Sequence, residues 1–125
     1  MMKKFFTKLL LVLCIISGVS LAQTVTTYVF VSFSLNDEAL KAYYVEAEKI
    51  GAVLVMRGLI DDSFTATKAK LDGLNIAYVI DPELFDKYNI NQVPTIVQDN
   101  GETIKKITGH IPLRDAIRIF NGEEH

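Results

Sequence analysis

Residues 90–97 read INQVPTIV, and this stretch decides the fold prediction for the 125-residue chain. A short run that suits a turn leads into Val93-Pro94, and β-branched residues follow. Because proline narrows the trans preference of its peptide bond to about 0.5–1 kcal/mol, tertiary contacts can hold this bond cis. We therefore predict a cis bond between Val93 and Pro94. Two roles stay open for it: fold architecture alone, or one wall of a peptide-docking groove.

The first 22 residues have the pattern of a secretory signal peptide. Residues 1–8 carry three lysines, residues 9–16 are all apolar, and the small residues Ser20 and Ala22 precede the expected cleavage point. The apolar run is shorter than the ~20 residues that span a bilayer. We expect export with cleavage after Ala22, and an uncleaved anchor or a buried first strand are the alternatives.

Cleavage would remove the single cysteine, Cys14. The mature chain, residues 23–125, would then have no thiol for a disulfide, for dithiol exchange or for nucleophilic catalysis. The full chain has 13 Lys and Arg against 15 Asp and Glu, and loss of three leader lysines leaves 10 against 15, a net charge of −5. An acidic surface without a basic stripe argues against nucleic acid as a direct partner.

The mature length suits one domain with one core. Apolar spacing predicts strands and helices in the order β-α-β-α-β-α, then a hairpin with an Asn-Gly turn and a last helix. The predicted strands are 28–33, 52–56, 76–80, 95–98 and 103–108, and the predicted helices are 34–51, 61–75, 81–88 and 113–120. Helices on both faces of such a mixed sheet make a three-layer α/β sandwich.

Local signals mark the ends and faces of the helices. Ser34 or Asn36 suits the cap of the first helix, and Asp81 before proline is a strong start for the third. Phe64 shares one face of the second helix with Leu71, so we expect Phe64 in the core or partly buried. We expect the same of the tyrosine pair 43–44.

Arg57 and Gly58 follow the second predicted strand, at the carboxyl end of the sheet, where open α/β folds bind ligands. Two roles stay open for Arg57. It pairs with Asp61 or Asp62, or it projects to a partner, as arginine often does at the centre of an interface. Arg57 and Gly58 are therefore candidates for partner contact.

Gly109 and His110 lead from the hairpin to the last helix and are the other two candidates for partner contact. His110 lacks the companion ligands that a metal site needs, and His125 is the terminal residue. No Ser/His/Asp pattern is evident. We predict no catalytic, cofactor-binding or metal site.

The element order, with Val-Pro-Thr before a strand and a glycine ahead of the last helix, resembles the thioredoxin fold. Four blocks give a closer resemblance, over most of residues 30–117: FVSFSLNDEALK, GAVLVMRGLIDDSF, IDPELFDKYNINQVPTIV and ITGHIPLRDAI. In this order, behind a leader, they are similar to the TrbC family of F-type conjugative systems. The resemblance implies a periplasmic, non-catalytic pilus-assembly factor of type IV secretion. It also implies docking to a TraW-like partner, to pilin or to other secretion components.

A second class of function stays open: a thioredoxin-like thiol oxidoreductase, or a chaperone relative of periplasmic disulfide enzymes. Ser34 and Asp37 lie at the junction where such proteins carry their two thiols, and we interpret both as capping residues. A serine hydroxyl without an adjacent base is a poor nucleophile. One departure from the family pattern is Pro112, where a capping serine is expected, so the start of the last helix is expected to be poorly capped.

Overall fold

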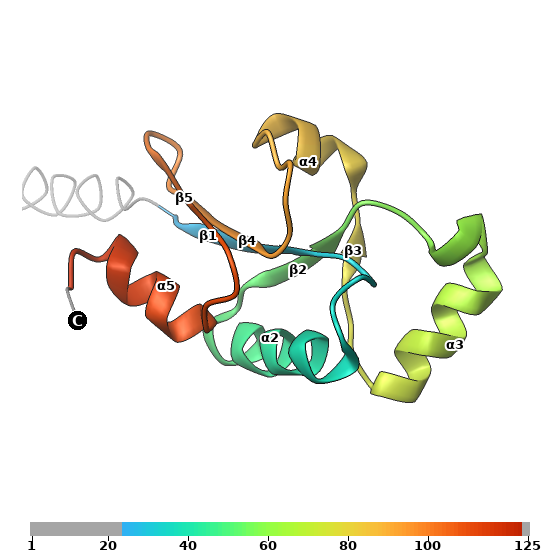
Figure 1. The fold of residues 1–125 in the computed structure, drawn as a ribbon. Coiled ribbons are helices and arrows are strands. Elements are labelled where there is room, and N and C mark those ends of the chain that lie inside the picture. The colour runs from blue at the N-terminus through green and yellow to red at the C-terminus, as the bar shows by residue number, and fades with distance from the viewer. Residues whose placement is uncertain (1–23, 124–125) are drawn as a thin grey trace, which may run out of the picture.

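The computed structural model describes residues 24–123, and the predicted leader with Cys14 lies outside them. Figure 1 shows the arrangement of the elements. In chain order they are β1 (Thr26–Val31), α2 (Asp37–Ile50), β2 (Val53–Met56), the 3₁₀ turn η1 (Ile60–Asp62), α3 (Phe64–Leu74), β3 (Val79–Ile80), α4 (Pro82–Lys87), β4 (Thr95–Asp99), β5 (Ile104–Thr108) and α5 (Leu113–Phe120). Within residues 24–123, no helix is both long and apolar enough to cross a membrane.

The strands form one mixed sheet in the order β3-β2-β1-β4-β5. The pairs β1–β2 and β2–β3 are parallel, whereas β4 runs antiparallel to both β1 and β5. Helices α2 and α5 cover one face of the sheet and α4 covers the other (Figure 1). The predicted three-layer α/β sandwich is therefore confirmed.

Two apolar clusters lie on opposite faces of the sheet. Val29 and Val31 face the larger cluster, which contains buried residues of α2 and α5. Phe30 between them faces the smaller cluster, where its ring meets Phe85 of α4 edge to face, with 5.0 Å between the ring centroids. Because β1 contributes to both clusters, its sequence is apolar without alternation.

The start of α2 differs in detail from the prediction. Asn36 is the cap, and its side-chain oxygen accepts a hydrogen bond from the Ala39 N–H at 2.7 Å. Ser34 is not a cap, because its hydroxyl bonds to the hydroxyl of Ser32. Asp37 instead pairs with Lys70 of α3, at 2.8 Å between Oδ1 and Nζ. Of the two predicted caps, Asn36 is confirmed and Ser34 is wrong. Asp37 is not a cap; it lies in the first turn and links two helices.

Strand boundaries also differ. β1 begins at Thr26 rather than at residue 28, because the antiparallel neighbour β4 pairs as far as Asp99 with Thr26. β3 has two residues rather than five, because only Val55 and Met56 of the short strand β2 offer it partners. The sheet therefore ends on a very short edge strand.

Phe64 is not in the core. Ser63 caps α3 by accepting a hydrogen bond from the Ala66 N–H at 3.0 Å, so Phe64 is the first residue of the helix. Its side chain is 71% exposed, whereas Thr67 and Leu71 of the same helix are buried. Since α3 lies beside the β3 edge (Figure 1), only the later turns of the helix reach the apolar cluster.

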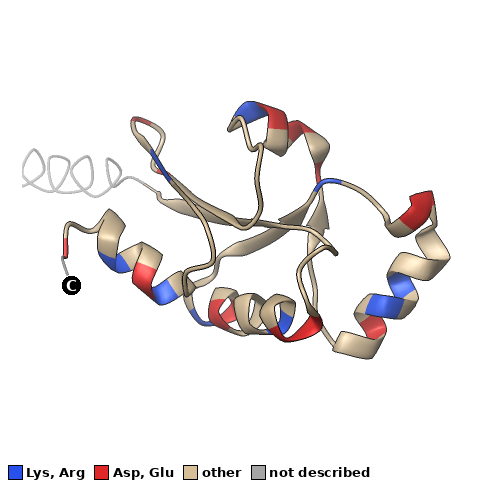
Figure 2. Cartoon of the chain, viewed as in Figure 1, with Lys and Arg blue, Asp and Glu red and all other residues tan. Residues whose placement is uncertain are grey.

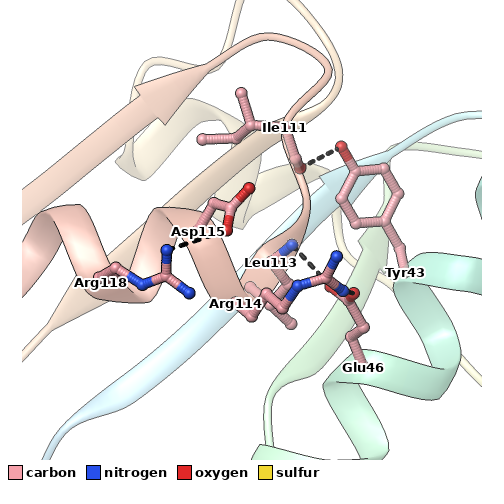
Figure 3. A network of polar contacts seen from close by, with 7 residues as sticks. All are labelled: Tyr43, Glu46, Ile111, Leu113, Arg114, Asp115 and Arg118. Carbon is pink, nitrogen blue, oxygen red and sulfur yellow. Dashed lines mark hydrogen bonds and ion pairs between the residues drawn. The ribbon is translucent and has the colours of Figure 1, made fainter. Parts of the chain in front are cut away.

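The start of α5 is capped from another helix. Pro112 makes no side-chain cap, but Glu46 of α2 accepts a hydrogen bond from the Leu113 N–H at 2.6 Å. The second carboxylate oxygen of Glu46 accepts from the Arg114 guanidinium at 2.8 Å, as Figure 3 shows. The expectation of a poorly capped start is therefore corrected. The carboxylate also suits the positive end of the α5 dipole.

We expect Glu46→Ala to lower the free energy of unfolding by about 1–2 kcal/mol, the usual cost of a lost N-cap, measured by denaturant unfolding. Glu46→Gln should cost less, since its amide oxygen can still accept from Leu113. Glu48→Ala, on the same helix but without an ion pair to any described residue, is the matched control. Equal losses for Glu46→Ala and Glu48→Ala would contradict the capping role.

Candidate functional site

The Val93–Pro94 peptide bond is cis. Pro94 is buried and Val93 is half-buried, packed against both apolar clusters. The Pro94 carbonyl accepts a hydrogen bond from the Gly109 N–H at 2.9 Å, and the Thr95 hydroxyl donates to the Gln92 carbonyl at 2.7 Å. No described residue makes a backbone hydrogen bond with Val93. The predicted cis bond is present, and the structure brings Pro94 together with Gly109.

Arg57 and Gly58 are exposed at the rim of a groove of about 460 Å³, here called the carboxyl-edge groove. It lies where β1 and β2 end and is lined by Ser32, Phe33, Met56, Arg57, Gly58, Leu59, Ile60 and Asp61. Four of these side chains are apolar. The prediction that Arg57 and Gly58 stand at the carboxyl end of the sheet is confirmed.

Arg57 pairs with neither Asp61 nor Asp62. Its guanidinium lies 3.8 Å from the Asp86 carboxylate of α4 and 5.3 Å from the centre of the Phe85 ring. Both aspartates of η1 have left-handed backbone conformations, with φ of 49° and 54°, which turn the chain after the groove. Since Arg57 and Asp86 are both largely exposed, their ion pair contributes little to stability. Of the two roles left open for Arg57, pairing with Asp61 or Asp62 is therefore wrong, and contact with a partner stays a prediction.

His110 lines a second groove of about 350 Å³ between α2 and α5, here called the α2–α5 groove. Its other lining residues are Ala39, Ala42, Tyr43, Glu46, Ile111, Pro112 and Arg114. The buried Tyr43 donates its hydroxyl to the Ile111 carbonyl at 2.8 Å (Figure 3). Sequence reasoning missed Glu46 and Arg114 because their contacts join residues 67 and 68 positions apart.

Of the predicted contact residues, three line grooves in two separate places, and Gly109 lines neither groove. Arg57 and Gly58 belong to the carboxyl-edge groove, and His110 belongs to the α2–α5 groove. Val93 and Pro94 line neither groove. Among residues 24–123, no three His, Cys, Asp or Glu side chains are grouped so that they could hold a metal ion. The two grooves are therefore the candidate sites that these residues mark.

A hydrogen bond between the buried Tyr88 and the partly exposed Asp99 shifts the pKa values of both groups. The Tyr88 hydroxyl donates to the Asp99 carboxylate at 2.6 Å and so joins the end of α4 to β4. This bond, with a second from the Gly101 N–H, lowers the pKa of Asp99 below its ordinary value of 3.8. Burial, followed by the same bond, raises the pKa of Tyr88. The pair lies outside both grooves and serves the fold.

Two solved structures share the fold. StoA from Bacillus subtilis aligns with a TM-score of 0.52 at 16% identity, over 81% of this chain and 83% of its own. MTB dsbF, in mixed oxidized and reduced forms, aligns with a TM-score of 0.55 at 14% identity, over 86% of each chain. The fold is thioredoxin-like, as predicted. At these identities, the likeness concerns the fold alone.

Residues 29–119 match the family model TrbC, which describes the pilin assembly protein of the type-F conjugative transfer system. The chain belongs to this family. A relative, periplasmic protein TrbC of Escherichia coli (strain K12), is 30% identical over 93 residues. The alignment covers 70% of this chain, but the chain spans only 44% of that relative's length. The family resemblance predicted from four sequence blocks is confirmed.

Gly109→Ala should lower the free energy of unfolding by about 1–3 kcal/mol, because a φ of 130° is strained for any residue with a Cβ. Gly58→Ala is the matched control. Its Cβ would meet no atom within 4 Å, and its φ is outside the left-handed region. Thermal unfolding of both variants measures the difference. Similar melting temperatures would contradict a conformational requirement for glycine at 109.

Tyr88→Phe should lower stability at neutral pH, and its deficit should shrink as the pH falls below about 4. The direction of this pH dependence follows because the pKa of Asp99 is lower in the folded protein than in the unfolded chain. The contribution of the ionised Asp99 to the free energy of unfolding is present above the unfolded pKa of 3.8 and is lost as the pH falls through the folded pKa. Urea unfolding between about pH 7 and pH 3 measures it. Tyr78→Phe is the control, because the pKa of Tyr78 is raised by burial and not by a hydrogen bond. A deficit independent of pH would contradict the coupling.

Proposed function

We propose that this chain is a periplasmic, non-catalytic assembly factor for a conjugative pilus and that it acts by docking to a TraW-like component. The observation that carries the proposal is the family match over residues 29–119. The predicted leader and the name of the relative, periplasmic protein TrbC, support the location. Other components of the transfer system, pilin included, are further candidate partners.

The absence of thiols supports a role without catalysis. Residues 24–123 contain no cysteine, and Cys14 belongs to the predicted leader. At the strand-to-helix junction, Asn36 caps α2 and Asp37 pairs with Lys70. Both residues are therefore engaged in holding helices. Thiol exchange needs a thiolate at such a place, and neither side chain supplies one.

The carboxyl-edge groove is the docking surface that the geometry favours. Its lining combines four apolar side chains with the exposed Arg57. The Phe85 ring beneath the guanidinium orients it, and the ion pair with Asp86 is too exposed and too long to occupy it fully. Apolar contact with a carboxylate placed on Arg57 is the interaction that this surface offers a partner.

Arg57→Ala should weaken binding of the TraW-like protein of the same transfer system by about tenfold or more, as expected of an interface arginine. The melting temperature of the Arg57→Ala variant should change little, because the ion pair between Arg57 and Asp86 is exposed. Arg118→Ala is the matched control. Arg118 also makes a 3.8 Å ion pair, to Asp115, but lies on α5 and lines neither groove. Titration calorimetry with the purified proteins measures the affinities.

His110→Ala in the same titration compares the two grooves. Loss of affinity with His110→Ala but not with Arg57→Ala would move the docking surface to the α2–α5 groove and overturn the assignment to the carboxyl-edge groove. Reduction of insulin disulfides above background by the same preparation would contradict the non-catalytic part of the proposal.

A further inference from the structure

The two edges of the sheet carry different side chains. On β5, Lys105 and Lys106 bind the carbonyls of Phe120 and Tyr88, at 2.6 and 3.2 Å. Edge lysines of this kind discourage pairing with another strand. On the other edge, residues 75–80 carry no charge, as the tan colour along β3 shows in Figure 2. Val79 is 44% exposed and Ile80 is 36% exposed.

The backbone at the β3 edge is open to a further strand. The Asp81 N–H donates to the Met56 carbonyl at 2.9 Å, and Met56 is the register partner of Ile80. In this parallel pair Met56 is the residue that bonds across to the other strand, because its carbonyl accepts from the residue after Ile80. The N–H and C=O of Ile80 therefore point away from β2. No described residue outside the sheet bonds to them. An extended segment is the conformation that satisfies such groups.

Two hollows, one next to α2 and one next to α3, adjoin this edge. One, of about 230 Å³, lies between the edge and α2 and includes Tyr44 and Glu48 in its lining. The other, of about 260 Å³, lies beside α3 and includes the exposed Phe64 in its lining. Both are lined by Ala77 and Tyr78, so they are adjacent. Apolar side chains of an added strand would find room in them.

Two carboxylates near this edge are left without a cation in the part of the chain that the structure describes. Lys68 beside the second hollow is paired with Asp72 at 2.9 Å. Glu48 in the first hollow and Glu83, just beyond β3 on α4, make no ion pair with any described residue. A strand that carries lysine or arginine beside its apolar residues complements this arrangement. A second copy of the chain would bring the same carboxylates and is disfavoured.

We propose that the β3 edge binds an extended segment of a partner polypeptide, apolar in its centre and basic at its flanks, as a sixth strand of the sheet. The flanking cations lie near Glu48 and Glu83, and the apolar residues cover Val79 and Ile80. This surface is separate from both grooves, and the inference does not depend on the role in pilus assembly.

The test uses the purified protein in the form that cells produce and two blocked heptapeptides. Both alternate valine and threonine in the centre; one has lysine at its ends and the other has glutamate. The lysine peptide should bind at least about tenfold more tightly at low salt, and it should shift the backbone amide resonances of Tyr78 and Ile80. Equal affinity for the two peptides, or amide shifts at β5 instead, would overturn the proposal.

Val79→Lys should weaken binding of the lysine peptide by about tenfold, because it adds a like charge at the edge. Ile104→Lys on β5, where Ile104 is 56% exposed, is the matched control and should leave binding unchanged. Equal effects of the two substitutions would overturn the assignment of the edge. A concentration-dependent dimer that Val79→Lys abolishes, seen by sedimentation equilibrium, would overturn the choice of occupant. If Val79→Lys does not fold, the amide shifts that the lysine peptide causes in the unsubstituted protein test the assignment of the edge.

Discussion

Burial of β1 on both faces is the constraint on which the rest of the structure depends. Val29, Phe30 and Val31 are completely buried, and they point alternately into the two apolar clusters. A strand in this position needs helices above and below it and a strand on each side. The parallel neighbour β2 and the antiparallel neighbour β4 meet that need, and together they place the carboxyl-edge groove where β1 and β2 end.

The second link between layers is polar and runs through one carboxylate. Glu46 of α2 accepts hydrogen bonds from both Leu113 and Arg114, so it replaces the cap that Pro112 cannot provide. The buried Tyr43 ties the preceding Ile111 to the same helix. These contacts hold α5 against α2 and shape the groove that contains His110.

The chain combines membership of the TrbC family with a thioredoxin-like fold. The cis bond at Pro94 and the tie from its carbonyl to Gly109 are present, but residues 24–123 carry no thiol to use them. At the start of α2, Asn36 and Asp37 serve the packing of helices. In the proposed function, the fold provides a scaffold whose surfaces bind a partner through shape and charge complementarity.

The sequence by itself determined the order of the elements, the cis-proline turn and the family, because these depend on local periodicity, turn residues and contiguous motifs. It could not find the cap at Glu46 or the partner of Arg57, since those contacts join segments distant along the chain. It also placed Phe64 inside, because helical spacing shows which residues share a face but not whether that face reaches a core. Only the tertiary structure decided where the sheet ends, and so left Phe64 and β3 at an open edge.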